Sequence, residues 1–219
     1  MNEQYTKKLE SVIKQMLRPL RGIPFKLVIE GISDHKIISF DKNDKRDIQV
    51  LNKLKEVAKA AGSAVNKKGI LRPRSNEVGN DIEPFVKDSL DKIGYNASTP
   101  QSKSGKAKSA GYPDIEFVDE FGRPNYLECK TFNIKNIGTT QRTFYLSPSS
   151  EFKITKDAHH FMISFEMFVK NTKGNNQIYN CKSWKILTLE DMEVDVKYEF
   201  NSDNVRMYTG SAILAEGTL

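Results

Sequence analysis

The segment PDIEFVDEFGRPNYLECKTF, residues 113–132, holds two short apolar runs separated by a turn-forming stretch, and it predicts a β-hairpin. Side chains alternate between the two faces of a strand. Asp114 therefore points away from Ile115, while Glu128 and Lys130 share one face of the second strand. If the apolar side chains face the core, two carboxylates and a lysine meet outside it.

Two carboxylates beside a lysine suit metal-assisted hydrolysis of a phosphodiester. Mg2+ takes oxygen ligands from one or two carboxylates, water and substrate phosphate. A lysine next to such an ion can position or activate a water. The same residues also fit the solvated face of an amphipathic hairpin, because half-exposed strands routinely carry charge.

The order of these residues resembles the signature of the PD-(D/E)xK nuclease superfamily, which includes many type II restriction endonucleases. The match consists of Pro113-Asp114, a turn, and Glu128-Cys129-Lys130 within an apolar strand. In that superfamily a helix supplying another carboxylate precedes the two strands, and a further helix and a buried strand follow them. The chain offers these parts in this order over residues 75–170.

The resemblance implies an α/β fold with a restriction-endonuclease-like core, in which helices flank a central mixed β-sheet. It implies that Asp114 and Glu128 hold Mg2+ and that Lys130 orients or activates the attacking water. The expected function is Mg2+-dependent cleavage of double-stranded DNA at a short specific site by a type II restriction endonuclease. A homodimer is expected, because cutting both strands of a palindrome needs two active sites.

Two other functions fit the same residues. A structure-specific or repair nuclease of the superfamily would share the site but recognise junctions or ends. A non-catalytic DNA-binding protein would keep only the fold.

A helix before the hairpin carries a further candidate carboxylate. Apolar residues recur at helical spacing over residues 78–93, and Gly94 is a suitable stop. Because Pro84 is tolerated best in a first turn, the helix is expected to begin near Asn80 or Asp81, or to bend. Glu83, next to the apolar stripe, is our catalytic candidate in preference to Glu77. An exposed glutamate favoured by the helix dipole is the alternative.

Two polar segments are candidates for DNA contact. The loop over residues 98–111 carries three lysines among small residues, which suits phosphate contact, or simply a solvated loop: Lys103, Lys106 and Lys108. Residues 139–150 mix polar and aromatic side chains. Gln141 and Arg142 there suit adenine and guanine edges, and exposed positions of a core segment are the other interpretation.

The remaining pattern predicts helices over 5–20 and 47–61, a hairpin from 25–29 and 36–40, a strand buried on both faces over 161–169 and an outer strand over 194–200. We interpret residues 1–219 as a single nuclease domain. Its parts are an N-terminal accessory region with helices and a β-hairpin (1–74), a catalytic core (75–170) and a C-terminal β extension (171–219).

Composition agrees with a DNA-directed protein. The 219 residues carry a formal net charge of +6 with a pI near 9.1, which favours a polyanionic partner. Two cysteines, Cys129 and Cys181, support neither a disulfide framework nor a cysteine-based zinc site. The N-terminus lacks an apolar signal region, and the longest apolar run is too short to span a bilayer. The sequence therefore predicts a cytoplasmic protein without a membrane partner.

Overall fold

A computed structural model describes residues 2–18, 20–107, 110–133, 135, 137–140, 143–199, 201–208, 213 and 215. The chain forms two compact units. The larger is Pro24–Met192, and the smaller combines Met1–Ile23 with Glu193–Leu219.

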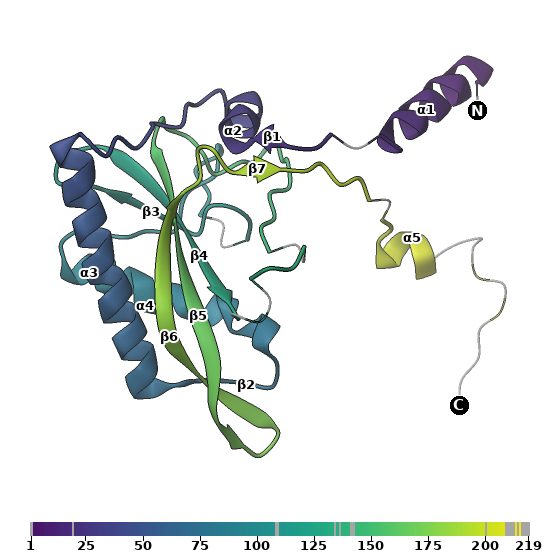
Figure 1. Cartoon of the computed structure of the whole chain (residues 1–219). Helices are drawn as coiled ribbons and strands as arrows, with labels where there is room; N and C mark the ends of the chain where they lie inside the picture. The colour runs from purple at the N-terminus through teal and green to yellow at the C-terminus, as the bar shows by residue number, and fades with distance from the viewer. Residues whose placement is uncertain are drawn as a thin grey trace. The chain divides into compact units, whose positions relative to one another are not determined.

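The larger unit is built on a five-stranded sheet with the order β2-β6-β5-β4-β3 (Figure 1). Its strands are β2 (Ile70–Arg72), β3 (Ile115–Val118), β4 (Pro124–Phe132), β5 (His159–Lys173) and β6 (Asn176–Thr188). β4 and β5 run parallel, and the other neighbours pair antiparallel. The predicted mixed sheet, α/β fold class and hairpin are therefore confirmed.

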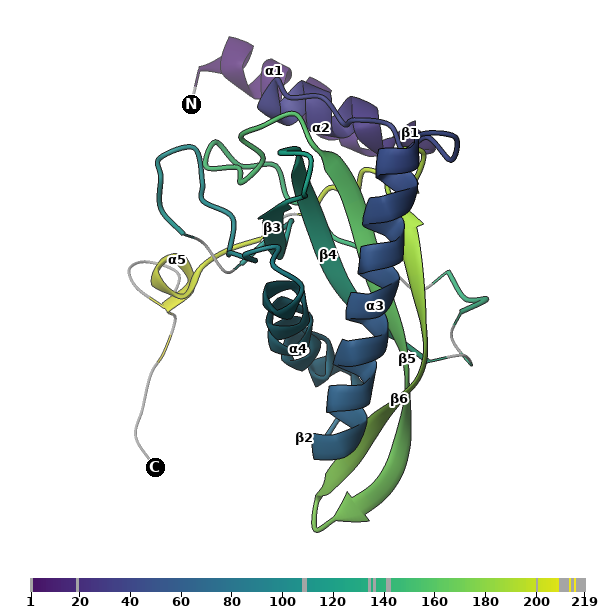
Figure 2. The ribbon, with the colours of Figure 1, turned by 90° about the vertical axis from the view of Figure 1, so that its left-hand side faces the viewer.

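Two helices, α3 (Lys45–Lys68) and α4 (Gly79–Lys92), cover one face of this sheet (Figures 1 and 2). Asp44 caps α3 by accepting a hydrogen bond from the Arg46 N–H at 2.8 Å. After α4 the chain turns at Gly94, whose φ of +89° suits glycine. α3 extends past the predicted 47–61, and α4 begins at Gly79 with Pro84 inside it, close to the predicted start.

The core lies between these helices and the sheet. Apolar side chains of α3 and α4 pack with those of β3 to β6, including Leu54, Val57, Ile82, Val86, Ile115, Leu127, Ile163 and Phe165. Gly62 allows α3 to approach β6 closely, because a Cβ there would lie 3.2 Å from Cys181 Sγ. α3 thus contributes to the same core as the hairpin, although its residues fall in the region that we assigned as accessory.

The predicted hairpin over 25–40 is wrong. Residues 25–33 form α2 (Phe25–Ser33), which begins after Pro24 and ends at Asp34, with φ +59°. Its buried residues Phe25, Ile29 and Ser33 recur every four positions. Residues 36–40 form no strand, and Ile38 donates a backbone hydrogen bond to Ala158 at 2.8 Å. The apolar run over residues 25–29 fits the spacing of a strand as well as that of a helix. The helix forms because it buries Phe25 and Ile29 on one face.

The helix expected between the Glu-x-Lys strand and the next strand falls in a segment that is only partly described. Among the described residues of 133–158, Lys135 has 3-10 helical conformation and no α-helix is present. Later in this crossover the chain is anchored by a hydrogen bond from Thr155 N–H to Tyr126 Oη at 3.0 Å. The buried strand itself is confirmed as β5, whose residues 159–167 are all buried.

β5 and β6 form a long hairpin that extends beyond the end of α3 (Figure 2). The chain here is exposed over residues 168–175, and the register shifts at Glu166/Met167 and Val169/Asn171. Such bulges increase strand twist and bend.

The smaller unit contains α1 (Glu3–Met16), α5 (Asn204–Tyr208) and the short strand β7 (Glu193–Val194), which pairs with β1 (Ile23–Pro24). α1 matches the first predicted helix. The outer strand expected over 194–200 is reduced to β7, and residue 200 lies outside the described residues. No described helix is long and apolar enough to span a membrane.

Candidate active site

The hairpin register brings Asp114 to the Glu-x-Lys segment. Ile115 of β3 pairs with Leu127 of β4, so Asp114, just before β3, is level with Glu128. Asp114 Oδ2 accepts a hydrogen bond from the Cys129 N–H at 2.8 Å. The backbone between Glu128 and Lys130 therefore holds Asp114 in place.

Glu128 and Lys130 form an ion pair, with 2.6 Å between Lys130 Nζ and Glu128 Oε1. Glu128 is only 3 % exposed, whereas the Lys130 side chain is 29 % exposed. Glu128 Oε2 is buried and has no hydrogen-bond partner among the described residues. The expectation of an open polar face is therefore wrong for Glu128, which is buried on its strand together with both neighbours, Leu127 and Cys129.

Aromatic side chains cover part of the face of β4 that carries Glu128 and Lys130. Phe25, Tyr112 and Phe144 contact one another edge to face, with ring centroids 5.3–5.4 Å apart. Lys130 Nζ lies 5.9 Å from the Phe144 centroid. These rings, from α2 and from the segments on either side of the hairpin, exclude water from this face of β4. Glu128 is buried for this reason.

Burial raises the pKa of both carboxyls, and in each case the charge of a neighbouring carboxylate adds to it, Asp114 for Glu128 and Glu83 for Asp114. Burial is the main cause for Glu128, the Asp114 charge adds to it, and the pKa rises to about 7 although nearby Lys130 and Lys153 oppose the change. Burial likewise raises the pKa of Asp114, against the Cys129 hydrogen bond and the Lys130 charge. A half-buried and a buried carboxylate so close together carry a free-energy cost that a cation would reduce.

The donor set fits a hard divalent ion. Asp114 and Glu128 offer carboxylate oxygens, and the unpartnered Oε2 is an acceptor whose desolvation is uncompensated. In the described part of the chain, no three or more His, Cys, Asp or Glu side chains group as a metal site. An ion here would rest on two carboxylates with water and phosphate completing its shell, as Mg2+ often does.

Glu83, the candidate from α4, lies near this pair. Its Oε1 is 2.6 Å from Lys87 Nζ, and its negative charge raises the pKa of Asp114. Glu77 instead pairs with Arg74, at 3.0 Å. Of the two glutamates considered from sequence, Glu83 is the one whose charge acts on Asp114.

Lys153 is a residue that sequence reasoning missed. It is 2 % exposed, and its charge lowers the pKa of both Asp114 and Glu128. It follows β4 by twenty residues in a loop without periodicity, so no motif links it to the Glu-x-Lys strand. The weak signal was its place between Phe152 and Ile154, because a lysine between apolar residues can be buried if it is paired.

The predicted DNA-contact residues are partly described. The Lys103 N–H donates to the Phe152 carbonyl at 3.0 Å, and Lys103 Nζ lies 5.5 Å from the Phe152 ring centroid. Lys106 accepts a backbone hydrogen bond from Ser102 at 2.8 Å. The lysine loop is thus anchored one residue from Lys153. Three predicted contacts, Lys108, Gln141 and Arg142, lie outside the described residues.

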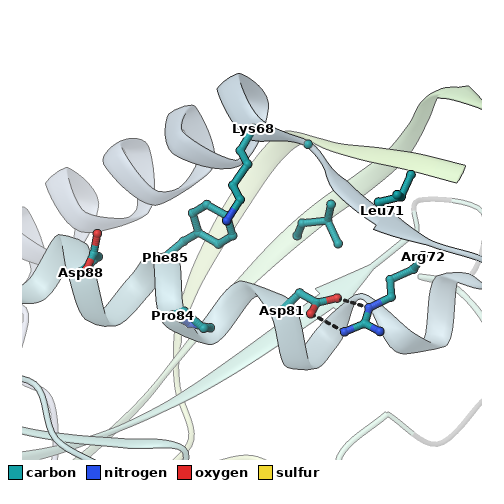
Figure 3. Close-up of a pocket in the computed structure, with 9 residues that line it drawn as sticks. Lys68, Leu71, Arg72, Asp81, Pro84, Phe85 and Asp88 are labelled. Atoms are coloured by element: carbon teal, nitrogen blue, oxygen red, sulfur yellow. Dashed lines mark hydrogen bonds and ion pairs between the residues drawn. The ribbon is translucent and has the colours of Figure 1, made fainter. Parts of the chain in front are cut away.

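A separate cavity of about 490 Å³ lies between the end of α3, β2 and α4 (Figure 3). Arg72 donates two hydrogen bonds to Asp81 there, at 2.6 and 2.7 Å. Lys68 Nζ is 5.7 Å from the Phe85 ring centroid. The described lining contains no predicted site residue, so this cavity and the carboxylate pair are different places.

Comparison with known proteins identifies the family to which the chain belongs. The sequence matches the type II restriction enzyme MjaV family over residues 19–211. It is 39 % identical over 233 residues to a protein of Methanocaldococcus jannaschii named type II restriction enzyme MjaV, covering 100 % of this chain and 99 % of that protein. The comparison with solved structures gave no match. The chain therefore belongs to the type II restriction enzyme MjaV family.

Proposed function

We propose that this protein is a Mg2+-dependent endonuclease that hydrolyses phosphodiester bonds of double-stranded DNA at a short specific site. The observation that carries the proposal is the half-buried Asp114 level with the buried Glu128, with Lys130 held 2.6 Å from Glu128 Oε1. Membership of a type II restriction enzyme family supports the same chemistry and favours site-specific cleavage over junction or repair activity.

In this proposal Asp114 and Glu128 hold the ion. When bound, Mg2+ supplies electrophilic stabilisation of the charge that develops on the phosphate. Lys130 is more exposed than Glu128, so its ammonium can donate to the attacking water or to a phosphate oxygen. The Cys129 N–H keeps Asp114 in position while the site is empty of substrate. Glu83 with Lys87 adds charge beside the pair.

DNA contact is proposed for Lys103, Lys106 and Lys108, and for Gln141 and Arg142. Lysines neutralise phosphates without reading sequence, whereas an amide and a guanidinium can read base edges. Anchoring of the Lys103 backbone to Phe152 supports a loop that delivers the DNA backbone close to the carboxylates.

We also propose a homodimer in which α1 pairs with α1 of a second copy. No residue of this described helix is buried, and its apolar stripe is Tyr5, Leu9, Val12 and Ile13. The first turn is acidic at Glu3 and the last turn basic at Lys14, so two antiparallel copies have complementary charges. A two-fold dimer also supplies two sites for two strands.

Sedimentation of the full chain tests the dimer. Leu9→Lys with Ile13→Lys should convert dimer to monomer, whereas Ser11→Lys, on the opposite side of the helical wheel, should not. A wild-type monomer, or a double variant that remains dimeric, would contradict pairing through α1.

The enzymatic proposal is tested by incubating the protein with a plasmid of known sequence and mapping the ends. Mg2+ or Mn2+ should give fragments with defined ends, Ca2+ should support binding with little turnover, and EDTA should stop cleavage. The matched control is Glu116→Gln, which removes a carboxylate of the same hairpin that pairs with Lys156 at 3.6 Å. It should cut normally. Full cleavage in excess EDTA would contradict the proposal.

A further inference from the structure

The hairpin of β5 and β6 continues past both of its neighbours in the sheet (Figures 1 and 2). β4 pairs with β5 only as far as Glu166, and β2 pairs with β6 no closer to the turn than Gln177. The two strands stay paired with each other up to the turn at residues 174–175, where Gly174 has a φ of +59°. The exposed end of the hairpin, residues 168–175, is therefore a two-stranded ribbon, which we call the β-ribbon.

The charge of this hairpin is of one sign. The chain has no acidic residue between Glu166 and Glu190, and that stretch contains four lysines: Lys170, Lys173, Lys182 and Lys185. Lys182 pairs with Glu166 at 3.1 Å. Lys170 and Lys173 are exposed on the β-ribbon and form no ion pair with any described residue. Their uncompensated positive charge favours a polyanionic partner.

The shape and side chains of the β-ribbon suit double-stranded DNA. The major groove of B-DNA, about 12 Å wide, admits a two-stranded ribbon. Phosphates border the groove within reach of lysines, and base edges inside it accept and donate hydrogen bonds to amides. Amide side chains gather around the turn: Asn171, Asn175, Asn176 and Gln177.

The sheet register sets the distance between the β-ribbon and the proposed cleavage site, both of which belong to the larger unit. Lys130 pairs with Ser164 of β5, and Lys170 and Lys173 come six and nine residues later along the same strand. At about 3.3 Å per residue, these lysines lie on the order of 20–30 Å from Lys130. This is a span of roughly six to nine base pairs. The β-ribbon can therefore reach DNA beside a short recognition site, but not the cleaved phosphate.

We propose that the β-ribbon is a DNA-binding arm that enters the major groove of the duplex flanking the cleavage site. Lys170 and Lys173 contact phosphates that border the groove. This inference rests on the proposed function, because the flank is defined by a cleavage site at Asp114 and Glu128. The arm contributes affinity without touching the reacting atoms, so the protein needs a longer duplex than its recognition site for full binding.

Affinity for duplexes of different length tests the arm. Binding of the full-length protein is measured in Ca2+, on duplexes that carry the site mapped by plasmid cleavage with about 4 or about 15 base pairs on each side. The longer flanks should tighten wild-type binding roughly tenfold or more. Lys170→Ala with Lys173→Ala should lose most of this gain and lower the salt slope by about two.

The matched control is Lys42→Ala with Lys45→Ala. It removes the same charge from exposed positions at the opposite end of α3 and should keep the wild-type gain. Methylation of guanine N7 in the flanks, which obstructs the major groove, should weaken binding by the wild type more than binding by the Lys170 and Lys173 double variant.

Equal wild-type affinity for the two duplex lengths would overturn the inference, and this measurement needs no variant to fold. A length gain that survives loss of both lysines would also overturn it. A double variant that sediments differently but keeps the gain would show that the β-ribbon binds protein instead, and would overturn it too. Plasmid cleavage separates the two proposals. If the wild type cuts without sensing the flanks, only the arm is wrong; if it never cuts in Mg2+, the proposed function is wrong and the arm has no cleavage site to flank.

Discussion

The β3–β4 hairpin carries buried charge at two places that differ in how fully it is hydrogen-bonded. At the turn, Arg123 joins Asp47 at 2.6 Å and Asp119 at 2.9 Å. The remaining carboxylate oxygens accept backbone hydrogen bonds, from Asp41 for Asp47 and from Phe121 and Arg123 for Asp119. Every oxygen of these two carboxylates has a hydrogen-bond partner. Among the described residues around them, Arg123 Nη2 and both ring nitrogens of His159, whose Nε2 lies 3.8 Å from Asp47 Oδ1, have none.

At the Glu-x-Lys segment the carboxylates have fewer hydrogen-bond partners. Glu128 Oε2 has no partner in the described part of the chain, and Asp114 and Glu128 raise each other's free energy by repulsion. Buried polar groups are normally hydrogen-bonded, and exceptions point to function. Arg123 with Asp47 and Asp119, called here the Arg123 cluster, therefore stabilises the hairpin, whereas the open acceptor of Glu128 supports the proposed metal-binding role of the Asp114–Glu128 pair.

The largest effect should come from Arg123→Met. Removing the arginine leaves Asp47 and Asp119 buried without their ionic partner, and breaking a buried pair in this way costs about 3–5 kcal/mol. Denaturant unfolding measures this loss. Arg46→Met is the matched control, because the Arg46–Asp44 pair, at 2.7 Å, is much more exposed and should contribute much less to stability. If both variants lost the same free energy of unfolding, the Arg123 ion pairs would stabilise the protein no more than an exposed pair does.

The next effect is on cleavage. Asp114→Ala, Glu128→Ala and Lys130→Ala should each lower the rate on the order of a hundredfold or more, because charge stabilisation of the transition state is lost. The two carboxylate variants should bind DNA as well or better, because a negative charge that would face phosphate is removed. Lys130→Ala should melt lower, because Glu128 loses its partner.

Single-turnover cleavage, Ca2+-supported binding and thermal melts separate these outcomes. The Glu116→Gln variant is again the control. Normal cutting by all three alanine variants would show that the pair is not catalytic and that the contrast with the Arg123 cluster has no functional meaning.

A smaller effect concerns pH. The pKa of Glu128 lies at about 7 instead of the usual 4.5, so the folded state binds a proton more tightly than the unfolded chain. Metal-free protein should therefore lose stability as pH rises from about 4.5 to about 7, and Glu128→Gln should reduce this loss, leaving the part that comes from Asp114. With limiting Mg2+, cleavage should rise with pH, by up to about tenfold per unit, and level off above 7, because the ion must displace the proton.

Raising the Mg2+ concentration should shift that cleavage profile to lower pH. A profile that is independent of Mg2+ would mean that Glu128 does not exchange its proton for the ion.

The smallest effect should follow replacement of Lys103, Lys106 and Lys108 by alanine. Binding should weaken for all DNA sequences alike, and the slope of log affinity against log salt should fall by roughly one for each lost phosphate contact. Replacing Lys59 and Lys67, on exposed positions of α3, should leave the slope unchanged. A triple variant with the wild-type slope would show that the loop does not contact DNA.

The spacing of apolar residues was sufficient to predict the helices and strands in which it follows a single period. The alternation over 113–132 predicted the hairpin, and helical spacing predicted α1, α3 and α4, because these side chains bury one face whatever surrounds them. Where a short apolar run fitted two periods, as at Phe25 to Ile29, the prediction was wrong. The contacts of Phe25 with Tyr112 and Phe144, far along the chain, favoured the helix.

The sequence by itself singled out the residues that we propose carry the chemistry: Asp114, Glu128 and Lys130 follow from alternation within two adjacent strands and from their resemblance to a known motif. Only the tertiary structure decided that Glu128 is buried, that its pKa rises to about 7, and that Lys153 joins the site. Strand periodicity is a local property that is set by backbone geometry. Burial and electrostatic coupling depend on what packs over the strand, and those residues, α2 and the loop carrying Lys153, come from distant parts of the chain.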